Sequence, residues 1–171
     1  MTLCRTSLQI VMIASVWLVT APATAQTRQP ADVFVGWAPV FVDAEYNILP
    51  AWALSVAGKG VVTPVFDASG WYFCCDQNIH NFLGGVRIRS AATEGARPFG
   101  QVLAGTSIFH ANGTAAGLAF VPGGGVDVPV TGHTVAIRVQ GDYFGLFMPG
   151  DYGRYYWTQV WRLSTGVVFP F

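Results

Sequence analysis

The amino-acid sequence predicts an all-β protein: an eight-stranded antiparallel up-and-down transmembrane β-barrel, preceded by a signal peptide. Its 171 residues suffice for one domain, and they are 52% hydrophobic but only 11% charged, whereas roughly 25% is charged in ordinary soluble domains. Beyond residue 25 no apolar run reaches the roughly 20 residues that a membrane-spanning helix needs. The C-terminal stretch alternates apolar with small or polar side chains and carries aromatic residues at both ends. These three observations favour strands that turn every second residue toward lipid.

The N-terminal segment has the pattern of a secretory signal peptide. Arg5 supplies the positive charge, the apolar core runs from Ile10 to Thr20, and Ala23-Thr24-Ala25 fits a small-residue cleavage site. The apolar core is too short for the alternative, a membrane anchor. We therefore expect a signal peptide over residues 1–25, a short lead over 26–31 and the barrel domain over 32–171.

Period-two alternation divides the domain into strands, because a strand sends successive side chains to opposite faces. The predicted strands are Asp32–Val42, Trp52–Lys59, Val61–Ser69, His80–Ser90, Pro98–His110, Ala116–Val130, Thr134–Phe147 and Tyr155–Phe171. The longest irregular stretch is expected over Gly70–Asn78. The turns Lys59-Gly60, Ala91–Arg97 and Thr131–His133 are short or polar, which predicts that they share the periplasmic end with both chain termini.

Prolines inside several predicted strands oppose this pattern, because proline removes a hydrogen-bond donor from the ladder. They are Pro39, Pro64, Pro122 and Pro129. We expect them at strand ends or bulges, and Pro122 beside Gly123-Gly124-Gly125 predicts a bulge or a sharp bend.

The last strand shows the alternation most clearly. One face carries Trp161, Leu163, Thr165, Val167, Phe169 and Phe171, and the other carries Arg162, Ser164, Gly166, Val168 and Pro170. From Trp157 to Phe171 an extended chain covers roughly 46 Å at about 3.3 Å per residue. Tilted by about 40°, it rises roughly 35 Å, which suits an apolar band about 25 Å tall with aromatic girdles at its margins.

The terminal sequence LSTGVVFPF resembles the C-terminal strand of Gram-negative outer-membrane β-barrels. The stretches DVFVGW (32–37), GGGVDV (123–128), AIRVQGDY (136–143) and RLSTGVVF (162–169) are similar to the OmpA-type family of small outer-membrane barrel domains. The resemblance covers nearly all of the chain after the signal peptide. It implies a place in the outer membrane and an assembly machinery that reads Phe169 and Phe171 as a C-terminal signal.

The inward faces of the predicted strands collect charged residues of both signs. They are Asp67, Arg87, Arg89, Asp127, Arg138, Asp142 and Arg162. An eight-stranded barrel is only wide enough for side chains to fill, and unpaired charge there is costly. We therefore expect a structural ionic network in the lumen, with a narrow ion path as the alternative.

Other reactive side chains do not assemble into a recognisable site. Cys74 and Cys75 are adjacent, so they lack zinc-motif spacing even with Asp76 and His80 nearby, and they can join only through a strained bridge. His110 shares a strand with Ser107, but their opposite parity puts them on opposite faces. His133 lies in a predicted turn. The sequence thus predicts no catalytic residues, no cofactor and no metal site.

We expect a small non-enzymatic outer-membrane protein with a structural or interaction role. Its expected partners are the lipid bilayer and the barrel-assembly machinery, and the formal net charge of zero gives no reason to expect nucleic acid. The sequence does not identify an external ligand. One alternative is an outer-membrane lipid-modifying enzyme, which would need histidine, serine and acid at one rim. The other is a soluble lipocalin-like carrier of an apolar ligand, with its apolar face inside.

Overall fold

The computed structural model describes residues 31–42, 47–73, 77–90, 95–111, 113–130, 134–149 and 155–171. The predicted signal peptide, Cys74, Cys75 and His133 lie outside these ranges. The strands are β1 (Ala31–Trp37), β2 (Val40–Val42), β3 (Asn47–Leu49), β4 (Ala51–Gly58), β5 (Val62–Tyr72), β6 (Asn78–Arg89), β7 (Arg97–His110), β8 (Thr114–Pro129), β9 (Ala136–Pro149) and β10 (Tyr155–Pro170). In the described part of the chain, no helix is long and apolar enough to cross a bilayer.

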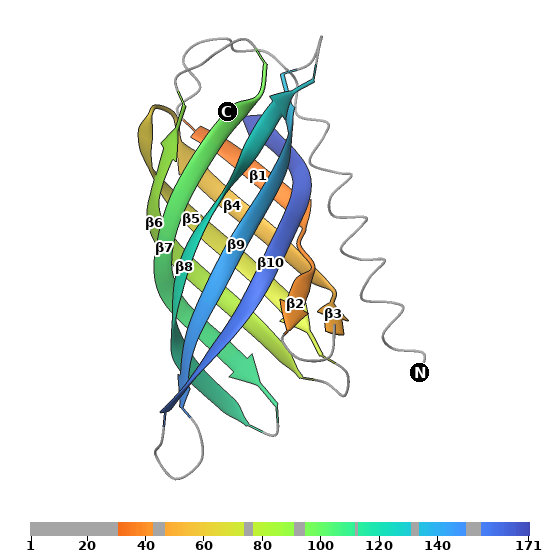
Figure 1. Cartoon of the computed structure of the whole chain (residues 1–171), viewed down its shortest axis with the longest axis vertical. Coiled ribbons are helices and arrows are strands. Elements are labelled where there is room, and N and C mark those ends of the chain that lie inside the picture. Colours follow the sequence, from red (N-terminus) through yellow and green to blue (C-terminus); the bar gives the residue numbers. More distant parts are fainter. Residues whose placement is uncertain are drawn as a thin grey trace.

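The strands close into one antiparallel barrel (Figure 1). β1 pairs with β4 on one side and with β10 on the other, so the sheet has no open edge along β1. The short strand β2 continues the path of β1 around the barrel, and β3 continues that of β4. The ten segments therefore form an eight-stranded barrel, which confirms the predicted fold class. Closure matters in a membrane because an unpaired strand edge has no water to satisfy it.

The two ends of the barrel differ, and we name them by what they contain. The terminal end holds Ala31 and Phe171, whose backbones bond to each other (Phe171 N–H to Ala31 O, 2.9 Å). The loop end holds β2, β3 and the connections β5–β6, β7–β8 and β9–β10. Figure 1 shows the C-terminus at the first end and β2 and β3 at the second.

The first predicted strand, Asp32–Val42, is broken in two between β1 and β2. The break falls at Ala38 and Pro39, because Pro39 has no N–H to donate. The backbone is still satisfied around it: the Leu163 N–H donates to Pro39 O at 3.0 Å, and the Ala38 N–H donates to Ala51 O at 2.9 Å. The prediction of one continuous strand is therefore wrong at this position, and the expectation that Pro39 ends a strand is confirmed.

Pro122 interrupts the pairing of β8 with β9 without a bulge. The rung Phe120↔Gly145 and the rung Gly123↔Asp142 keep one register, and only the two rungs between them are missing. The predicted bulge is therefore wrong, because the lost N–H removes local pairing but inserts no extra residue. Pro64 lies just beyond the last β4–β5 rung, Ala57↔Val65, and so disrupts nothing there.

The predicted irregular stretch Gly70–Asn78 is shorter in the structure. β5 continues through Trp71 to Tyr72, and β6 begins at Asn78. Trp71 faces inward, only 1% exposed, and packs edge-on against Phe144 at 5.3 Å between ring centres. Trp71 is therefore not an interfacial anchor, because the alternation of β5 continues past Gly70 and places residue 71 in the interior.

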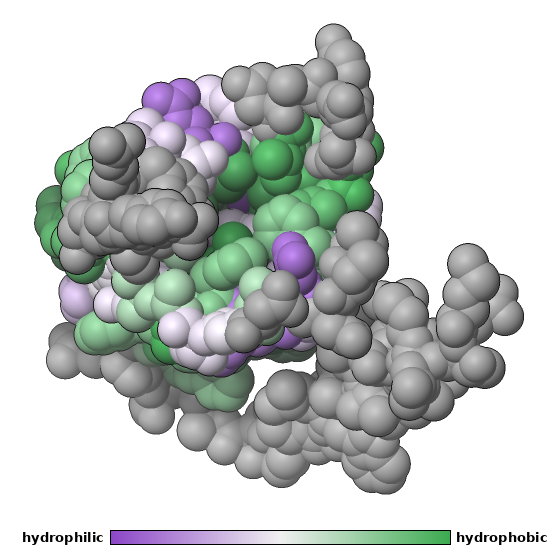
Figure 2. All heavy atoms as spheres, turned by 90° about the horizontal axis from the view of Figure 1, so that it is seen from below, coloured by the Kyte–Doolittle hydropathy of each residue, from purple (hydrophilic) through white to green (hydrophobic). Residues whose placement is uncertain are grey.

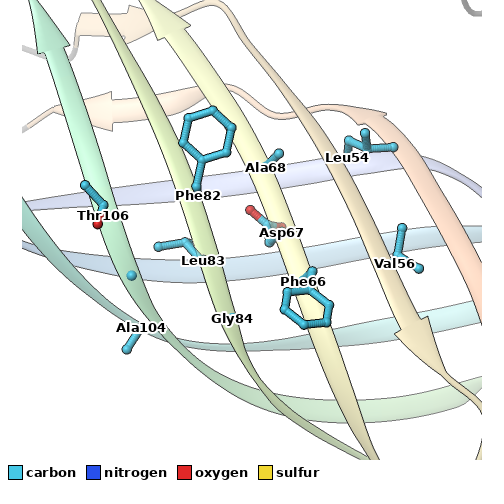
Figure 3. A pocket seen from close by; sticks show the side chains of 11 residues that line it. Leu54, Val56, Phe66, Asp67, Ala68, Phe82, Leu83, Gly84, Ala104 and Thr106 are labelled. Atoms are coloured by element: carbon cyan, nitrogen blue, oxygen red, sulfur yellow. The ribbon is translucent and has the colours of Figure 1, made fainter.

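The outer surface of the barrel is apolar. Large hydrophobic side chains stand exposed on every long strand, among them Phe66 (68% exposed), Phe82, Leu118, Ile137 and Leu163. Figure 3 shows part of this surface over β4 to β7, where Leu54, Val56, Phe66 and Phe82 border a shallow apolar groove. This inverts the usual soluble arrangement and agrees with the outward faces predicted for Phe66, Phe82, Ile137 and Leu163.

Candidate functional site in the barrel interior

The seven charged residues that the sequence placed on inward faces all lie inside the barrel. Asp67 comes from β5, Arg87 and Arg89 from β6, and the remaining four from β8, β9 and β10. All are buried except Arg89, whose side chain is 12% exposed. Asp32 of β1 joins them. Four arginines therefore face four aspartates in this interior set, so its formal charge is balanced.

A central cluster forms around Arg162. Its Nη1 and Nη2 donate to the two carboxylate oxygens of Asp67 at 3.0 and 3.1 Å. Its Nε and Nη2 also donate to Asp142 Oδ2 at 3.0 and 2.8 Å. The bidentate geometry suits the planar guanidinium. One buried cation thus holds two carboxylates, and the cluster alone carries one excess negative charge.

Two glutamines extend the central cluster, and one of them, Gln101, links it to Arg87. Arg87 donates through Nε and Nη2 to Gln101 Oε1 at 3.0 and 2.7 Å, and Gln101 Nε2 donates to Asp142 Oδ1 at 3.0 Å. Gln140 Nε2 donates to Asp142 Oδ2 at 2.7 Å. The amide of Gln101 therefore connects the surplus negative charge to an arginine. Sequence reasoning left both glutamines out of the network, although their inward parity was visible, because it considered only charged residues.

A second cluster lies nearer the terminal end. Arg138 binds Asp127 with two hydrogen bonds, of 2.6 and 2.8 Å, and Arg89 pairs with Asp32 at 2.6 Å. Arg87 and Arg138 each approach Asp32 Oδ1 to 3.9 Å. Among the described residues, that oxygen has no hydrogen-bond partner, and neither has Nη1 of Arg87 or of Arg138. Separations of this length between buried polar atoms suit bridging water.

The predicted ionic network did not include Asp32, which stands at the first position of a predicted strand. It shares the parity of Phe34, which the alternation placed on the face opposite Val33 and Val35, so the signal was present. Beyond Asp32 the barrel mouth forms a cavity of about 460 Å³, whose charged lining residues are Asp32, Lys59, Arg89, Arg97 and Asp127.

Aromatic rings cover the buried arginines. The guanidinium carbon of Arg162 lies 4.8 Å from the ring centre of Phe144, and that of Arg87 lies 4.6 Å from Phe99. Arg138 contacts both Phe99 at 4.7 Å and Phe34 at 5.1 Å. A desolvated cation gains from such contacts with the negative face of a ring.

Glycines make room for this packing in so narrow a barrel. At Gly36 and Gly166, which pair across β1 and β10, an added Cβ would collide with the ring of Phe34 and with backbone atoms. At Gly123 an added Cβ would collide with the carboxylate of Asp142. The network thus depends on neighbouring positions that have no side chain at all.

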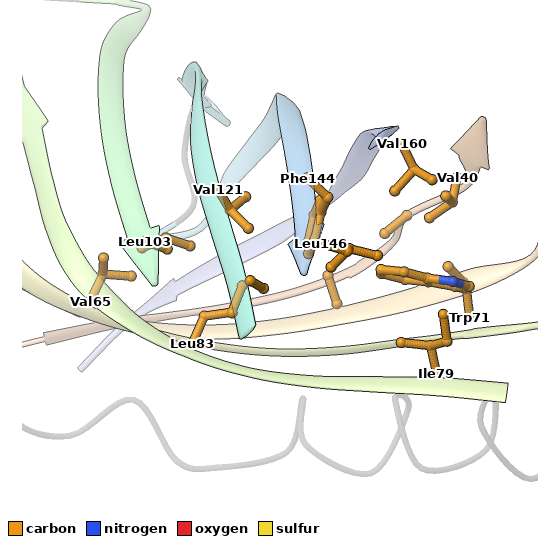
Figure 4. Close-up of a cluster of buried hydrophobic side chains, with 14 of the residues drawn as sticks. Val40, Val65, Trp71, Ile79, Leu83, Leu103, Val121, Phe144, Leu146 and Val160 are labelled. Atoms are coloured by element: carbon orange, nitrogen blue, oxygen red, sulfur yellow. The ribbon is translucent and has the colours of Figure 1, made fainter. Parts of the chain in front are cut away.

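The half of the interior toward the loop end is mostly apolar, with a buried polar group of Ser69, Asn81 and Ser107 between it and the central cluster. Its buried side chains include Val40, Trp71, Ile79, Phe144, Leu146 and Val160 (Figure 4). Figure 2, which looks onto the loop end, shows hydrophobic residues gathered around the centre of the barrel. The expectation of an ionic interior is therefore wrong for this half. Sequence reasoning followed the charged residues, and none of these buried side chains is charged.

Ser107 and His110 face opposite sides of β7, as their parity predicts. Ser107 is buried in the lumen and donates to Asn81 Oδ1 at 2.6 Å, whereas His110 Nδ1 lies 3.0 Å from Thr114 Oγ1 on the outer side. The two side chains therefore do not form a nucleophile and base pair. Within the described ranges, no group of three or more His, Cys, Asp or Glu side chains is placed to hold a metal ion.

A closed eight-stranded antiparallel barrel with an apolar exterior and a charged interior is the architecture of small outer-membrane barrels. Comparison with solved structures agrees with this class. Neisserial surface protein A superposes with a TM-score of 0.60 at 12% identity, covering 82% of this chain and 96% of the other. The N-terminal β-barrel domain of Pseudomonas aeruginosa OprF gives 0.56 at 13% identity, covering 82% and 97%. At such identities the likeness concerns the fold alone. No protein-family model matches the sequence, and no curated protein matches it.

Proposed function

We propose that this chain is a non-enzymatic outer-membrane protein with a structural or interaction role, and that its lumen does not conduct ions. The observation that carries the first part is the inversion of exposure. Phe66, Phe82 and Leu163 face outward, whereas Arg138, Asp142 and Arg162 face the axis. Burying this apolar exterior requires lipid, and the interior charges are already paired with each other.

The second part rests on the two halves of the interior. An ion entering at the terminal end meets a charged cavity, but farther on it meets the packed apolar cluster around Trp71 and Phe144. A hydrophobic constriction excludes water and therefore ions. The ion path that the sequence left open as an alternative is disfavoured by this apolar half.

Cell fractionation followed by electrophoresis tests the membrane assignment. The folded barrel should remain with the outer membrane and migrate differently in unheated and boiled samples, because detergent unfolds it only on heating. Recovery from the soluble periplasm without detergent would instead favour the carrier alternative. The exposed apolar surface argues against that alternative, since a soluble carrier needs a polar exterior.

The C-terminal aromatics are proposed to direct assembly. Phe171 is 54% exposed at the terminal end, where a partner could reach it. Replacing Phe171 with Ala should lower the amount of folded barrel in the outer membrane, while refolding of the purified protein into detergent stays unchanged. Phe147→Ala, at another exposed aromatic, is the matched control. Equal loss in both variants would mean that Phe171 is not an assembly signal.

The enzyme alternative has a separate test. Overexpression should leave the lipid A of the host unchanged if the protein is not a lipid-modifying enzyme. A new acylated, deacylated or otherwise modified lipid A species, abolished by replacing His110, would contradict the non-enzymatic proposal.

A further inference from the structure

Two histidines that are distant in the sequence lie together on the outside of the barrel at its loop end. His80 stands near the start of β6 and His110 at the end of β7, with 6.1 Å between their ring centres. Asn78 is the direct cross-strand partner of His110 and precedes His80 by two residues, so all three side chains leave the same face.

The side-chain oxygen of Asn78 lacks a partner. Oδ1 is buried and accepts no hydrogen bond within the described structure. A buried acceptor without a donor is costly. Two imidazoles and one unpartnered amide oxygen therefore share a small patch formed by adjacent strands.

Neighbouring side chains orient both rings. His110 Nδ1 lies 3.0 Å from the hydroxyl of Thr114, and in the tautomer in which Nδ1–H donates to that hydroxyl, Nε2 carries the lone pair. His80 packs against Trp52 at 6.3 Å and against Tyr72 at 6.2 Å between ring centres. An added Cβ at Gly70 would come within 2.8 Å of His80 Nδ1, so the glycine leaves room for the ring. Fixed rings lower the entropic cost of binding a ligand.

We propose that His80, His110 and the Asn78 side-chain oxygen bind one divalent transition-metal ion, with water completing its coordination. Imidazole suits Cu²⁺, Ni²⁺ and Zn²⁺, and Cu²⁺ should bind most tightly. With a metal–nitrogen bond of about 2.0–2.1 Å, a ring centre lies about 3.2 Å from the ion, so two rings on one ion are at most about 6.4 Å apart. The observed 6.1 Å fits that limit. This site is independent of the ion-pair network, which lies inside the barrel.

The experiment is a Cu²⁺ titration of the folded full-length protein in detergent, followed by electron paramagnetic resonance. The parent for the variants is C4S/C74S/C75S, so that thiols contribute no binding. We expect one equivalent to bind saturably, with hyperfine splitting from two imidazole nitrogens. H80Q and H110Q should each weaken binding at least tenfold, and N78A should weaken it by a smaller factor. H133Q, which removes a histidine outside the site, should leave the titration unchanged.

Each variant is first checked for the same heat-dependent shift on a gel as the parent, so that misfolding is not mistaken for lost binding. The proposal is overturned if C4S/C74S/C75S binds no copper, if H80Q and H110Q both titrate like this parent, or if H133Q loses as much affinity as they do. None of these outcomes depends on whether the barrel conducts ions or modifies lipid.

Discussion

At the scale of single residues, Arg162 has the most demanding position in the interior. It is 1% exposed and bonds to Asp67 and Asp142, which come from two other strands. Removing a buried charge from water is expensive, and only full pairing offsets the cost. A substitution that removes the cation would leave two carboxylates buried side by side.

We predict that Arg162→Leu lowers the free energy of unfolding by about 3–5 kcal/mol, because it leaves uncompensated buried charge. Arg97→Leu is the matched control, since Arg97 is exposed at the start of β7 and should change stability little. Urea titrations in detergent micelles, followed by tryptophan fluorescence, measure both. Equal midpoints for the two variants would show that the interior tolerates an unpaired carboxylate pair.

A second prediction at the scale of single residues concerns the glycines of the strands. Gly166→Ala should destabilise the barrel by about 1–3 kcal/mol, because the new methyl group meets the backbone of β1 and the ring of Phe34. Gly141→Ala should be nearly neutral, because nothing lies within 4 Å of an added Cβ there. The same urea titrations compare them, and a stability loss at residue 141 equal to that at 166 would refute the steric argument.

At the scale of elements, β10 shows how one strand serves two environments. Its partners are β9 along nearly its whole length, β1 toward the terminal end and β2 toward the loop end. Leu163 faces outward beside Arg162, which faces inward, so adjacent positions meet opposite requirements. A register slip of one residue would exchange them, and the apolar and charged sets therefore fix the register.

We predict that Leu163→Arg, on the lipid face near the middle of β10, destabilises the barrel by about 2–4 kcal/mol in vesicles. Gln159→Arg lies on the same face nearer the loop end and should cost less than about 1 kcal/mol, because the charge reaches the interface. Equilibrium refolding into phospholipid vesicles measures the difference. Indistinguishable costs would place residue 163 outside the hydrocarbon layer.

At the scale of the whole molecule, the interior is divided between an ionic half and a mostly apolar half. The charged cavity at the terminal end leads toward the central cluster, and the apolar residues of the loop-end half lie beyond it. Trp71 and Phe144 are in edge-to-face contact within that half, and Phe144 also covers Arg162. The ring of Phe144 therefore contacts both the ionic half and the apolar half of the interior.

We predict that the unsubstituted protein shows no steady single-channel conductance in planar bilayers. Replacing Trp71 and Phe144 together with Ala should produce a measurable ion current, because it opens the apolar constriction to water. The double variant Phe147→Ala/Trp157→Ala removes two exposed outward aromatics and should stay silent. Conductance in the unsubstituted protein would contradict the proposal that the lumen does not conduct ions.

The sequence alone was sufficient for the closed antiparallel barrel and for the outward-facing side of β5, β6, β9 and β10. Period-two alternation is a local property, and a membrane barrel displays it with little interference because one face of each strand meets hydrocarbon. The same alternation placed Asp67, Arg138 and Arg162 on inward faces. Proline chemistry is equally local, so a strand end at Pro39 was predictable.

Only the tertiary structure decided which side chains from different strands meet. The union of Asp67 with Arg162, the link through Gln101, and the approach of His80 to His110 all depend on strand register and barrel closure. The sealed loop-end half was decided in the same way, because the volume left by opposing strands determines whether Trp71 and Phe144 fill it. Alternation along one strand carries no information about the strands across the barrel. For this physical reason the sequence predicted the face of a residue but not its contacts.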